Sequence, residues 1–391
     1  MTTSRIPLLI AGGGLGGLAT ALALSRQGIA SHVVEKAPQF GEIGAGLQIA
    51  PNAARIIDRL GVMDDIRKTA VFPSRLAFLD AVTGEPVRIF DTRKPFIDRY
   101  GYPYFVMHRS DLLDALLAGC RRTPLVTLEP SKELSAVEDL GSGVRVTFAD
   151  GSKAECDALI GADGLHSRVR RYIAGAAEPV HHPFVAYRGA IPMGAVTKHA
   201  GLDAVVMYMG PGLHFVQYPV RGGELYNQVA VFKSKRFKPG DDWGTPDELD
   251  EAFSGCCEYV QGALKVINRD RRWPMIDRAP LGNWTRNRVT LMGDAAHPML
   301  QYLAQGACQA IEDAECIAAE IAKAGTDYAA AFLSYQGKRY LRTARVQTTA
   351  RFAGEYLFHL EGVPREVRNG LMANSSPTDY TPLDWLYAYG G

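Results

Sequence analysis

The sequence lacks a large net charge and lacks cysteines spaced for metal or redox chemistry. Its 43 Lys and Arg residues against 42 Asp and Glu residues leave a formal charge of +1, so no global positive field draws the protein to nucleic acid. The cysteines form no C-x-x-C pair of the kind found in zinc and thioredoxin-type sites; they are Cys120, Cys156, Cys256, Cys257, Cys308 and Cys316. We therefore expect reduced, mostly buried cysteines, no bound metal and no nucleic-acid partner.

Long hydrophobic runs are also scarce. The stretch Ile6–Ser25 has no charged residue, but five glycines between Gly12 and Gly17 would weaken a membrane helix there. No other segment approaches a continuous apolar span, so we expect no integral membrane segment and, by default, a cytoplasmic location. A chain of 391 residues with 47% hydrophobic and 22% charged residues is typical of a globular protein with two or three substructures.

The N-terminal residues have the pattern of a strand–turn–helix–strand unit. The apolar run Pro7–Ala11 predicts a strand, Leu18–Gln27 predicts a helix, and Ala30–Val34 predicts a second strand. The turn between the first two satisfies G-x-G-x-x-G: Gly12 permits the turn, Gly14 lets a pyrophosphate approach the backbone, and Gly17 lets helix and strand pack closely. This pattern indicates a dinucleotide-binding unit.

An acidic residue follows the second predicted strand. Glu35 is placed to accept hydrogen bonds from ribose hydroxyls, and its carboxylate disfavours a 2′-phosphate, which leaves FAD or NAD as the nucleotide. The free amides at the helix start would hold the phosphates. We include the neighbouring Leu15 and Lys36 in the expected cofactor site.

Two distant segments distinguish between these nucleotides. Cys156–Arg170 predicts a buried strand, a polar turn at Asp163 and a basic helix, and Arg288–Pro298 predicts a strand that ends in Gly293-Asp294. Taken alone, each turn could be an ordinary solvated turn.

Taken together and in this order, the motifs resemble those of the group A flavoprotein aromatic hydroxylases, which are single-component FAD monooxygenases. The resemblance covers nearly the whole chain and includes Asp163-Gly164 with Ser167 and Arg170. It implies a tightly but non-covalently bound FAD, NADH as a transient electron donor, and O2 as co-substrate. It also implies that Asp294 contacts the ribityl chain and that Asp163 lies near both FAD and the nicotinamide donor. Further cofactor residues implied by the resemblance are Gln48, Arg55 and Arg109, the last facing the flavin.

The absence of other sequence motifs excludes alternative reactions of a bound flavin. A second G-x-G-x-x-G in a βαβ context is absent, which suits an enzyme that binds NAD(P)H transiently. The C-x-x-x-x-C pair of disulfide reductases and the W-x-W-x-I-P signature of flavin halogenases are absent too. Monooxygenation is the flavin chemistry that remains.

The fold class that we expect is α/β, with a Rossmann-like FAD-binding domain, an inserted antiparallel-sheet substrate domain and C-terminal helices. Alternating apolar and polar residues predict strands over Phe184–Ile191, Val205–Met209, His214–Val220 and Tyr226–Phe232, and a hairpin of Leu76–Leu79 with Val87–Phe90. The FAD-binding domain is expected to comprise residues 1–73, 100–180 and 284–330, the substrate domain 74–99 and 181–283, and the helical segment 331–391.

A phenol hydroxylase needs a base that enriches the ring in electrons, and histidine is the best-suited base near neutral pH. Strand alternation puts His214 and Tyr218 on one face. A lone histidine in a sheet is more often structural, but a second segment supports His214. It contains Gln301 and runs into a helix at Gly306 and Ala307, whose N-terminus would stabilise negative charge on reduced flavin.

Gln301 together with His214, Tyr218 and Tyr104 is similar to the 3-hydroxybenzoate 6-hydroxylase subgroup. This resemblance implies hydroxylation of 3-hydroxybenzoate para to its hydroxyl, giving gentisate, with NADH. It implies catalytic roles for His214 and Gln301 and substrate contacts for Tyr218 and Tyr104. Salicylate hydroxylase-like members commonly have proline at the position of Gln301, and this departure leaves salicylate, other hydroxybenzoates and heteroaromatic phenols open as substrates.

The ring carboxylate has no firmly assigned partner in the sequence, and Arg188 is a candidate. Two functions of other classes stay open at this point: a flavin-free NAD-dependent dehydrogenase and a nucleotide-binding regulatory protein. His181-His182 is interpreted as part of an interdomain linker, and His297 as a residue that packs its loop. The aromatic tail Tyr380–Tyr389 is interpreted as a packed cap or a homodimer surface rather than a ligand cage.

Overall fold

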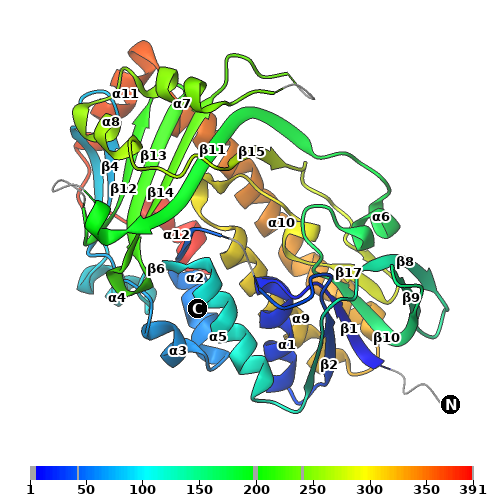
Figure 1. Ribbon diagram of the computed structural model, residues 1–391. Coiled ribbons are helices and arrows are strands. Elements are labelled where there is room, and N and C mark those ends of the chain that lie inside the picture. Colours follow the sequence, from blue (N-terminus) through cyan, green and yellow to red (C-terminus); the bar gives the residue numbers. More distant parts are fainter. Residues whose placement is uncertain (1–5, 42–43, 197–200, 239–241, 390–391) are drawn as a thin grey trace.

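The computed structural model of the protein describes residues 6–41, 44–196, 201–238 and 242–389. Figure 1 shows two large β-sheets at opposite ends of the molecule, with long helices between them. The helices are α1 (Leu15–Arg26), α2 (Pro51–Arg59), α3 (Met63–Arg67), α4 (Lys94–Tyr100), α5 (Arg109–Arg121), α6 (Arg168–Ala174), α7 (Pro246–Phe253), α8 (Glu258–Leu264), α9 (Gly306–Ala324), α10 (Tyr328–Ala353), α11 (Gly362–Ala373) and α12 (Thr381–Tyr387). Short 3₁₀ turns occupy Met193–Ala195, Arg221–Gly223, Gly293–Ala295 and Gln301–Leu303, and α10 continues into a π-helical turn, Gly354–Phe358.

The first sheet contains the dinucleotide-binding unit. Its strands are β1 (Ile6–Ala11), β2 (Ser31–Val34), β7 (Val126–Glu129), β8 (Leu134–Asp139), β9 (Val144–Phe148), β10 (Lys153–Gly161), β16 (Thr285–Arg286) and β17 (Val289–Leu291). The parallel strands have the order β17-β10-β1-β2-β7, and Ala11, Gly161 and Leu291 lie in register at their carboxyl ends. Because these ends meet at one edge, the turns after β1, β10 and β17 lie side by side. The fold thereby gathers the three predicted cofactor motifs.

The first sheet is covered by helices whose sequences suit burial. Alanine and leucine fill α1, which is buried along nearly its whole length and packs against α5 and α9. Alanine and leucine have the highest helix propensities, so this segment forms a helix despite its glycines. On another side, α6 packs against β8, β10 and β17.

The second sheet carries the wall of the candidate site. Its strands are β4 (Arg75–Asp80), β5 (Pro86–Asp91), β11 (Val180–Pro192), β12 (Ala204–Gly210), β13 (Leu213–Val220), β14 (Leu225–Lys233) and β15 (Arg272–Asp277), in the order β15-β11-β14-β13-β12-β4-β5. All neighbours are antiparallel except β4 and β12. One face packs against α7 and α8, through residues such as Phe215, Phe232 and Phe253. The opposite face turns toward α10 and the first sheet. A separate ribbon of β3 (Gly46–Ile49) and β6 (Phe105–His108) lies between the sheets.

The predicted fold class and the predicted strands are confirmed. The inserted antiparallel sheet is present, and each strand predicted for it lies inside an observed one, whereas β2 begins at Ser31, one residue after the predicted start. The domain boundaries stated above stay a prediction. The linker interpretation of His181-His182 is wrong, because both residues belong to β11 and pair with β15, and His182 Nε2 lies 2.9 Å from Asp277 Oδ1. Within the described ranges, no helix combines the length and the apolar character that a membrane crossing needs.

Candidate active site

A cavity of about 680 Å³ lies between the second sheet, the β3–β6 ribbon and the C-terminal helices. This volume suits a small aromatic ligand next to a cofactor ring. The predicted residues that line it come from all parts of the chain; they are Gln48, Tyr104, Arg109, Arg188, His214, Tyr218, Asp294, Gln301, Gly306 and Ala307. The structure therefore brings together most of the residues that the sequence proposed for catalysis and substrate binding.

Strand β13 places His214 and Tyr218 on the cavity wall. Leu213 and Phe215 point into the core formed with α7 and α8, whereas His214, Val216 and Tyr218 line the cavity. This alternation is the period of a strand, and it confirms that His214 and Tyr218 share a face. Their roles in the reaction stay a prediction.

His214 is 2% exposed, and its Nδ1 lies 2.8 Å from Nε2 of His359. Burial lowers the pKa of His214 to about 3, so its ring is neutral at neutral pH. Since Nδ1 is engaged, Nε2 is the ring nitrogen without a partner among the described residues. Sequence reasoning missed His359, which lies between the π-helical turn and α11, far along the chain from β13.

The segment that carries Gln301 bends sharply into α9. Gln301 begins a 3₁₀ turn, Ala304 adopts a left-handed conformation with φ of 53°, and α9 starts at Gly306. No side chain caps this helix start. Gly306 and Ala307 therefore present backbone amides to the cavity, with the partial positive charge of a helix N-terminus behind them.

Tyrosine side chains add polar groups to the cavity lining. Tyr104 Oη donates a hydrogen bond of 2.5 Å to Gln48 Oε1, and its ring contacts that of Tyr387 from α12. Burial raises the pKa of Tyr104 and of Tyr218, so both phenols stay protonated and available as donors. The aromatic tail packs against the protein as a cap, but Leu383, Trp385 and Tyr387 also line the cavity, which the interpretation of Tyr380–Tyr389 did not expect.

Arginine side chains supply positive charge to this mostly apolar cavity. Arg188 on β11 lies 4.1 Å from the centre of the Trp273 ring, and Arg109 lies beside Gly44 at the start of α5. Arg88 on β5 also lines the cavity, which the sequence did not suggest; it donates to the carbonyl of Asp379 at 2.8 Å. A buried cation facing an aromatic pocket suits the recognition of a carboxylate.

The glycine turn has room where a pyrophosphate would lie. Gly12 has φ of 113°, and an added Cβ would meet the carbonyl of Ala162 at 2.3 Å; at Gly17 it would meet the carbonyl of Gly12 at 2.0 Å. At Gly14 an added Cβ would meet nothing within 4 Å. Gly14 is also the N-cap of α1 and makes no side-chain cap, so the amides of Leu15, Gly16 and Gly17 can face a phosphate, whereas that of Leu18 already donates to the carbonyl of Gly14.

The acidic residue after β2 lies beside this turn. Glu35 accepts hydrogen bonds from the amides of Gly13, at 2.8 Å, and Ala37, at 2.9 Å. The neighbouring Lys36 is exposed. The carboxylate thus sits at the mouth of the turn, where the ribose of a bound dinucleotide would lie.

The Asp-Gly and Gly-Asp motifs are bonded to each other. Asp163 accepts from the amide of Arg168 at 2.7 Å and from the hydroxyl of Ser167, and burial raises its pKa. Arg170 donates to the carbonyls of Ala295 and Ala296, at 2.9 and 2.8 Å. This arginine holds the Asp294 loop against the segment that carries Asp163.

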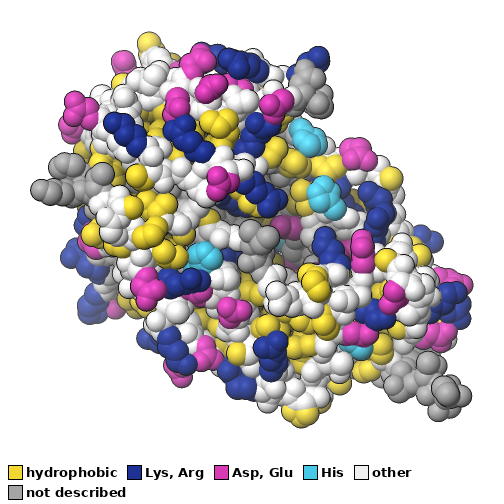
Figure 2. Space-filling view, in the orientation of Figure 1, with side chains coloured by type: hydrophobic (Ala, Val, Ile, Leu, Met, Phe, Trp, Pro, Cys, Tyr) yellow, Lys and Arg dark blue, Asp and Glu magenta, His cyan; other side chains and the backbone are white. Residues whose placement is uncertain are grey.

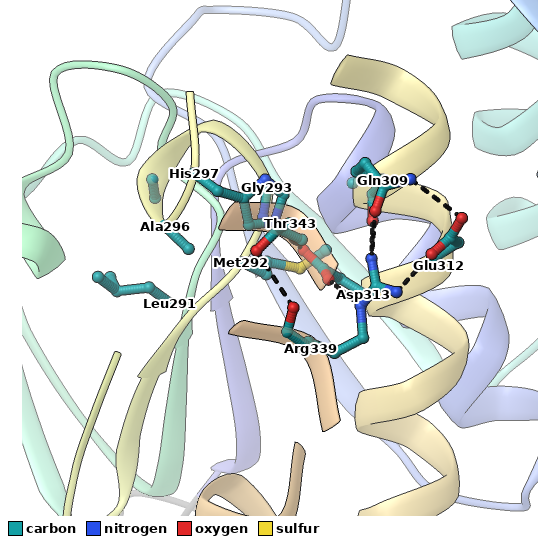
Figure 3. A network of polar contacts seen from close by, with 12 residues as sticks. Leu291, Met292, Gly293, Ala296, His297, Gln309, Glu312, Asp313, Arg339 and Thr343 are labelled. Atoms are coloured by element: carbon teal, nitrogen blue, oxygen red, sulfur yellow. Dashed lines mark hydrogen bonds and ion pairs between the residues drawn. The ribbon is translucent and has the colours of Figure 1, made fainter. Parts of the chain in front are cut away.

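A buried ionic network behind the Asp294 loop was also missed by sequence reasoning. The amide of Gly293 and the ring of His297 both bind Asp313 Oδ2, at 2.9 and 2.5 Å, so His297 packs its loop as expected. Asp313 in turn accepts from Arg339 Nε at 2.8 Å, and Arg339 also pairs with Glu312 (Figure 3). The sequence signal was the acidic pair on an otherwise apolar stretch of α9. Asp294 itself is exposed at the cavity.

Arg55, another predicted cofactor residue, is not among the residues that line the cavity. It is buried and donates to the carbonyls of Pro51 and Tyr100, at 3.3 and 2.9 Å. Its role toward the cofactor stays a prediction.

The arrangement fits an FAD molecule. The glycine turn and Glu35 would hold the pyrophosphate and a ribose, Asp163 and Asp294 flank the path toward the cavity, and the start of α9 would lie beside the flavin ring. Lys and Arg side chains are interspersed with Asp and Glu over the face drawn in Figure 2.

Comparisons with known proteins agree with this geometry. The family described as FAD binding domain matches residues 5–350. The chain is 39% identical over 384 residues to 3-hydroxybenzoate 6-hydroxylase 1 of Aquipseudomonas alcaligenes, covering 97% of each chain. Among solved structures, a Klebsiella pneumoniae HpxO variant complexed with FAD has a TM-score of 0.86 at 25% identity, covering 99% of this chain and 100% of that one. A salicylate hydroxylase substrate complex has a TM-score of 0.82 at 28% identity, covering 99% and 96%.

Proposed function

The chain belongs to the FAD-binding-domain family of aromatic-ring monooxygenases, and from this premise we propose that it hydroxylates 3-hydroxybenzoate. The new hydroxyl would enter para to the existing one and give gentisate, with NADH as electron donor and O2 as co-substrate. Membership of this family excludes the flavin-free dehydrogenase and the regulatory protein that the sequence left open.

The observation that carries the substrate proposal is the common cavity of His214, Gln301, Tyr104 and Tyr218. These residues are the ones that resemble the 3-hydroxybenzoate 6-hydroxylase subgroup, and they come from three separate segments of the chain, since His214 and Tyr218 share β13. Their meeting around one cavity supports a shared role with one phenolic ligand.

The chain's own side chains would prepare the ring for attack. Nε2 of His214 would accept the phenol proton in the neutral tautomer that carries its own proton on Nδ1, the nitrogen that lies against His359. Loss of that proton raises electron density ortho and para to the oxygen. The amide of Gln301, which both donates and accepts, would orient the hydroxyl. Bound FAD, once reduced by NADH, supplies activated oxygen to the electron-rich ring.

The remaining lining would hold the substrate and keep water out. The cavity has an apolar surface made by Leu76, Phe78, Met207 and Val216, while Arg188 would pair with the ring carboxylate.

A cytoplasmic location suits an enzyme that consumes NADH. The exposed apolar side chains on α10 and α11, such as Leu341 and Leu371, support a homodimer.

A panel of monohydroxybenzoates tests the proposal. Coupled NADH and oxygen consumption should be fastest with 3-hydroxybenzoate, and chromatography should identify gentisate as the product. Catechol from salicylate, with no gentisate from 3-hydroxybenzoate, would replace this substrate with salicylate, the alternative favoured by the structural similarity to a salicylate hydroxylase. A heteroaromatic phenol belongs in the same panel.

A further inference from the structure

His359 forms the back of the His214 site and was assigned no role by the sequence. Its Nε2 lies 2.8 Å from His214 Nδ1, and the two rings are nearly parallel, with an interplanar angle of 21°. His359 lies outside the cavity lining, so any effect on a ligand must pass through His214.

The position of the His359 ring is fixed on several sides. It stacks on Phe184 with ring centres 4.4 Å apart and meets the edge of Tyr302 at 5.3 Å. Its backbone carbonyl accepts a hydrogen bond of 3.1 Å from the amide of Gly212, in the turn before β13. A ring held this firmly keeps its Nε2 aimed at His214.

The hydrogen bond between the two rings permits two proton arrangements. In one, His214 carries its proton on Nδ1 and donates it to His359, which leaves Nε2 of His214 as an acceptor at the cavity. In the other, His359 donates to His214, and His214 Nε2 then carries a proton and acts as a donor toward the ligand. Only the first arrangement lets His214 accept a phenol proton.

We propose that His359 is a positioning residue that accepts the Nδ1–H hydrogen bond of His214 and thereby holds His214 in its accepting tautomer. When the phenol ionises, its O–H bond breaks and the proton binds Nε2 of His214, while the Nδ1–H bond of His214 stays intact. The negative charge is then on the phenolate oxygen and the positive charge on His214, whose Nδ1–H remains hydrogen-bonded to Nε2 of His359. This inference rests on the proposed function of His214 as the base.

The surroundings keep both rings neutral before the substrate ionises. Burial lowers the pKa of both, and His214 and Lys233 lower that of His359 further. A buried ring beside Lys233 is a poor place for positive charge, so His359 acts as a hydrogen-bond acceptor and the proton stays on His214. The charged or titratable groups around His359 are His214, Lys233 and Tyr302.

Nitrogen NMR of the FAD-loaded protein, labelled with ¹⁵N in its histidines, tests the tautomer without turnover. The His214 signals, assigned by comparison with His214→Gln, should show a protonated Nδ1 and an unprotonated Nε2. In His359→Phe, which keeps a ring on Phe184 but cannot accept a hydrogen bond, the proton should redistribute to Nε2. His181→Phe, at an exposed position of β11, is the matched control and should leave the pattern unchanged.

Kinetics with the phenol that the wild-type enzyme hydroxylates fastest supplies the second measurement. Loss of a residue that orients a reactive group typically costs ten- to a hundredfold, so His359→Phe should slow hydroxylation by that factor. Its KM and its rate of flavin reduction should stay near the wild-type values, and His359→Gln, which can accept through its amide oxygen, should recover most of the lost rate.

The substrate assignment and the role of His359 are contradicted by different results. If 3-hydroxybenzoate is not hydroxylated but another phenol is, only the substrate assignment falls. A proton on Nε2 of His214 in the wild-type protein, or a wild-type hydroxylation rate in His359→Phe, overturns the role of His359.

Discussion

The glycines of the cofactor turn differ in what an added side chain would meet. Gly12 and Gly17 face backbone atoms of the protein itself, whereas Gly14 faces open space. A side chain at Gly14 is therefore compatible with the fold and is in conflict only with a ligand. This difference separates a folding defect from a binding defect.

We expect Gly14→Val to fold but to lose FAD, because the valine would fill the space that the pyrophosphate needs. The measurement is flavin absorbance per protein after gel filtration, with circular dichroism as a check of folding. Gly255→Val, at another open position between α7 and α8, is the control and should retain the yellow colour. Stoichiometric flavin in Gly14→Val would show that the pyrophosphate binds elsewhere.

His214→Ala should reduce hydroxylation by 10²–10⁴-fold, the usual contribution of a general base. Flavin content and the rate of flavin reduction should change much less, so more of the consumed oxygen should appear as hydrogen peroxide. The ratio of hydroxylated product to NADH consumed should therefore fall. Gln301→Leu should lower this ratio too, because it removes the group that orients the phenol. Wild-type rates and coupling in both variants would mean that these side chains are structural.

Arg188→Gln should raise KM for the carboxylated substrate about ten- to a hundredfold, the loss expected when a charged hydrogen bond of about 1.5–3 kcal/mol is removed. A phenol without a carboxylate should be bound equally well by both proteins. If KM does not change, the same assay on Arg109→Gln and Arg88→Gln identifies which of the other cavity arginines binds the carboxylate.

At the scale of elements, α9 and α10 are joined by the buried ionic network. The Arg339 guanidinium and the His297 ring favour ionised Asp313, lowering its pKa to about 2 from 3.8 although burial opposes this. A carboxyl whose pKa is lower in the folded state stabilises the protein above the unfolded value, and that stability disappears as pH falls from 3.8 toward 2. The contribution corresponds to about 2 kcal/mol at neutral pH.

Asp313→Asn should therefore lower the free energy of unfolding by about 3 kcal/mol near pH 7, since it leaves Arg339 with a weakened partner. The difference from wild type should shrink between pH 4 and pH 2, as measured by urea denaturation of the FAD-loaded proteins. Asp98→Asn removes an exposed pair with Lys94 and should change stability by less than about 1 kcal/mol. A difference that does not depend on pH would contradict the low pKa of Asp313.

Elements whose signal is local were predictable from the sequence. The βαβ unit, the hairpin of β4 and β5, and the shared face of His214 and Tyr218 follow from periods of 3.6 and 2. The His214–His359 pair was not predictable, because 145 residues separate its members. Arg88 and the Asp313–Arg339 pair were missed for the same reason: only tertiary packing reveals which buried charges meet.

The reading of His181-His182 as a linker failed for a different reason. These polar residues precede Pro183, which lacks an amide proton and therefore suggests the end of a strand. The sheet accommodates the proline with a register shift between His181 and Val185, so β11 continues through it.

At the scale of the whole molecule, the cavity is closed by the C-terminal tail. Leu383, Trp385 and Tyr387 line it, and α12 is held by Arg342, which donates to the carbonyls of Trp385 and Leu386 at 3.1 and 2.9 Å. The ion pair of Arg99 with Asp384 fixes its outer side. The tail thus acts as one wall of the site rather than as a peripheral extension.

Truncation after Pro377 should leave FAD bound but open the cavity to water. We expect a higher KM for the aromatic substrate and more hydrogen peroxide per NADH, because water reaches the reacting oxygen. Asp384→Ala, which removes the partner of Arg99 and of the Tyr100 hydroxyl but keeps the tail, should produce the same changes in weaker form. Unchanged coupling in the truncated protein would show that the other walls exclude water alone.

The order of the strands has a consequence for synthesis on the ribosome. β1 pairs with β10, and β10 pairs with β17, so the first sheet is complete only after the ribosome has made both later strands. In the same way, β4 pairs with β12 only after the intervening chain has been made. An emerging polypeptide therefore exposes unpaired strand edges for much of translation, which favours chaperone binding and makes early fragments prone to aggregate. The residue that would contact the ribityl chain, Asp294, leaves the ribosome after the glycine turn by more than half the chain length. We therefore expect FAD to bind each new molecule only after most of the chain has been synthesised.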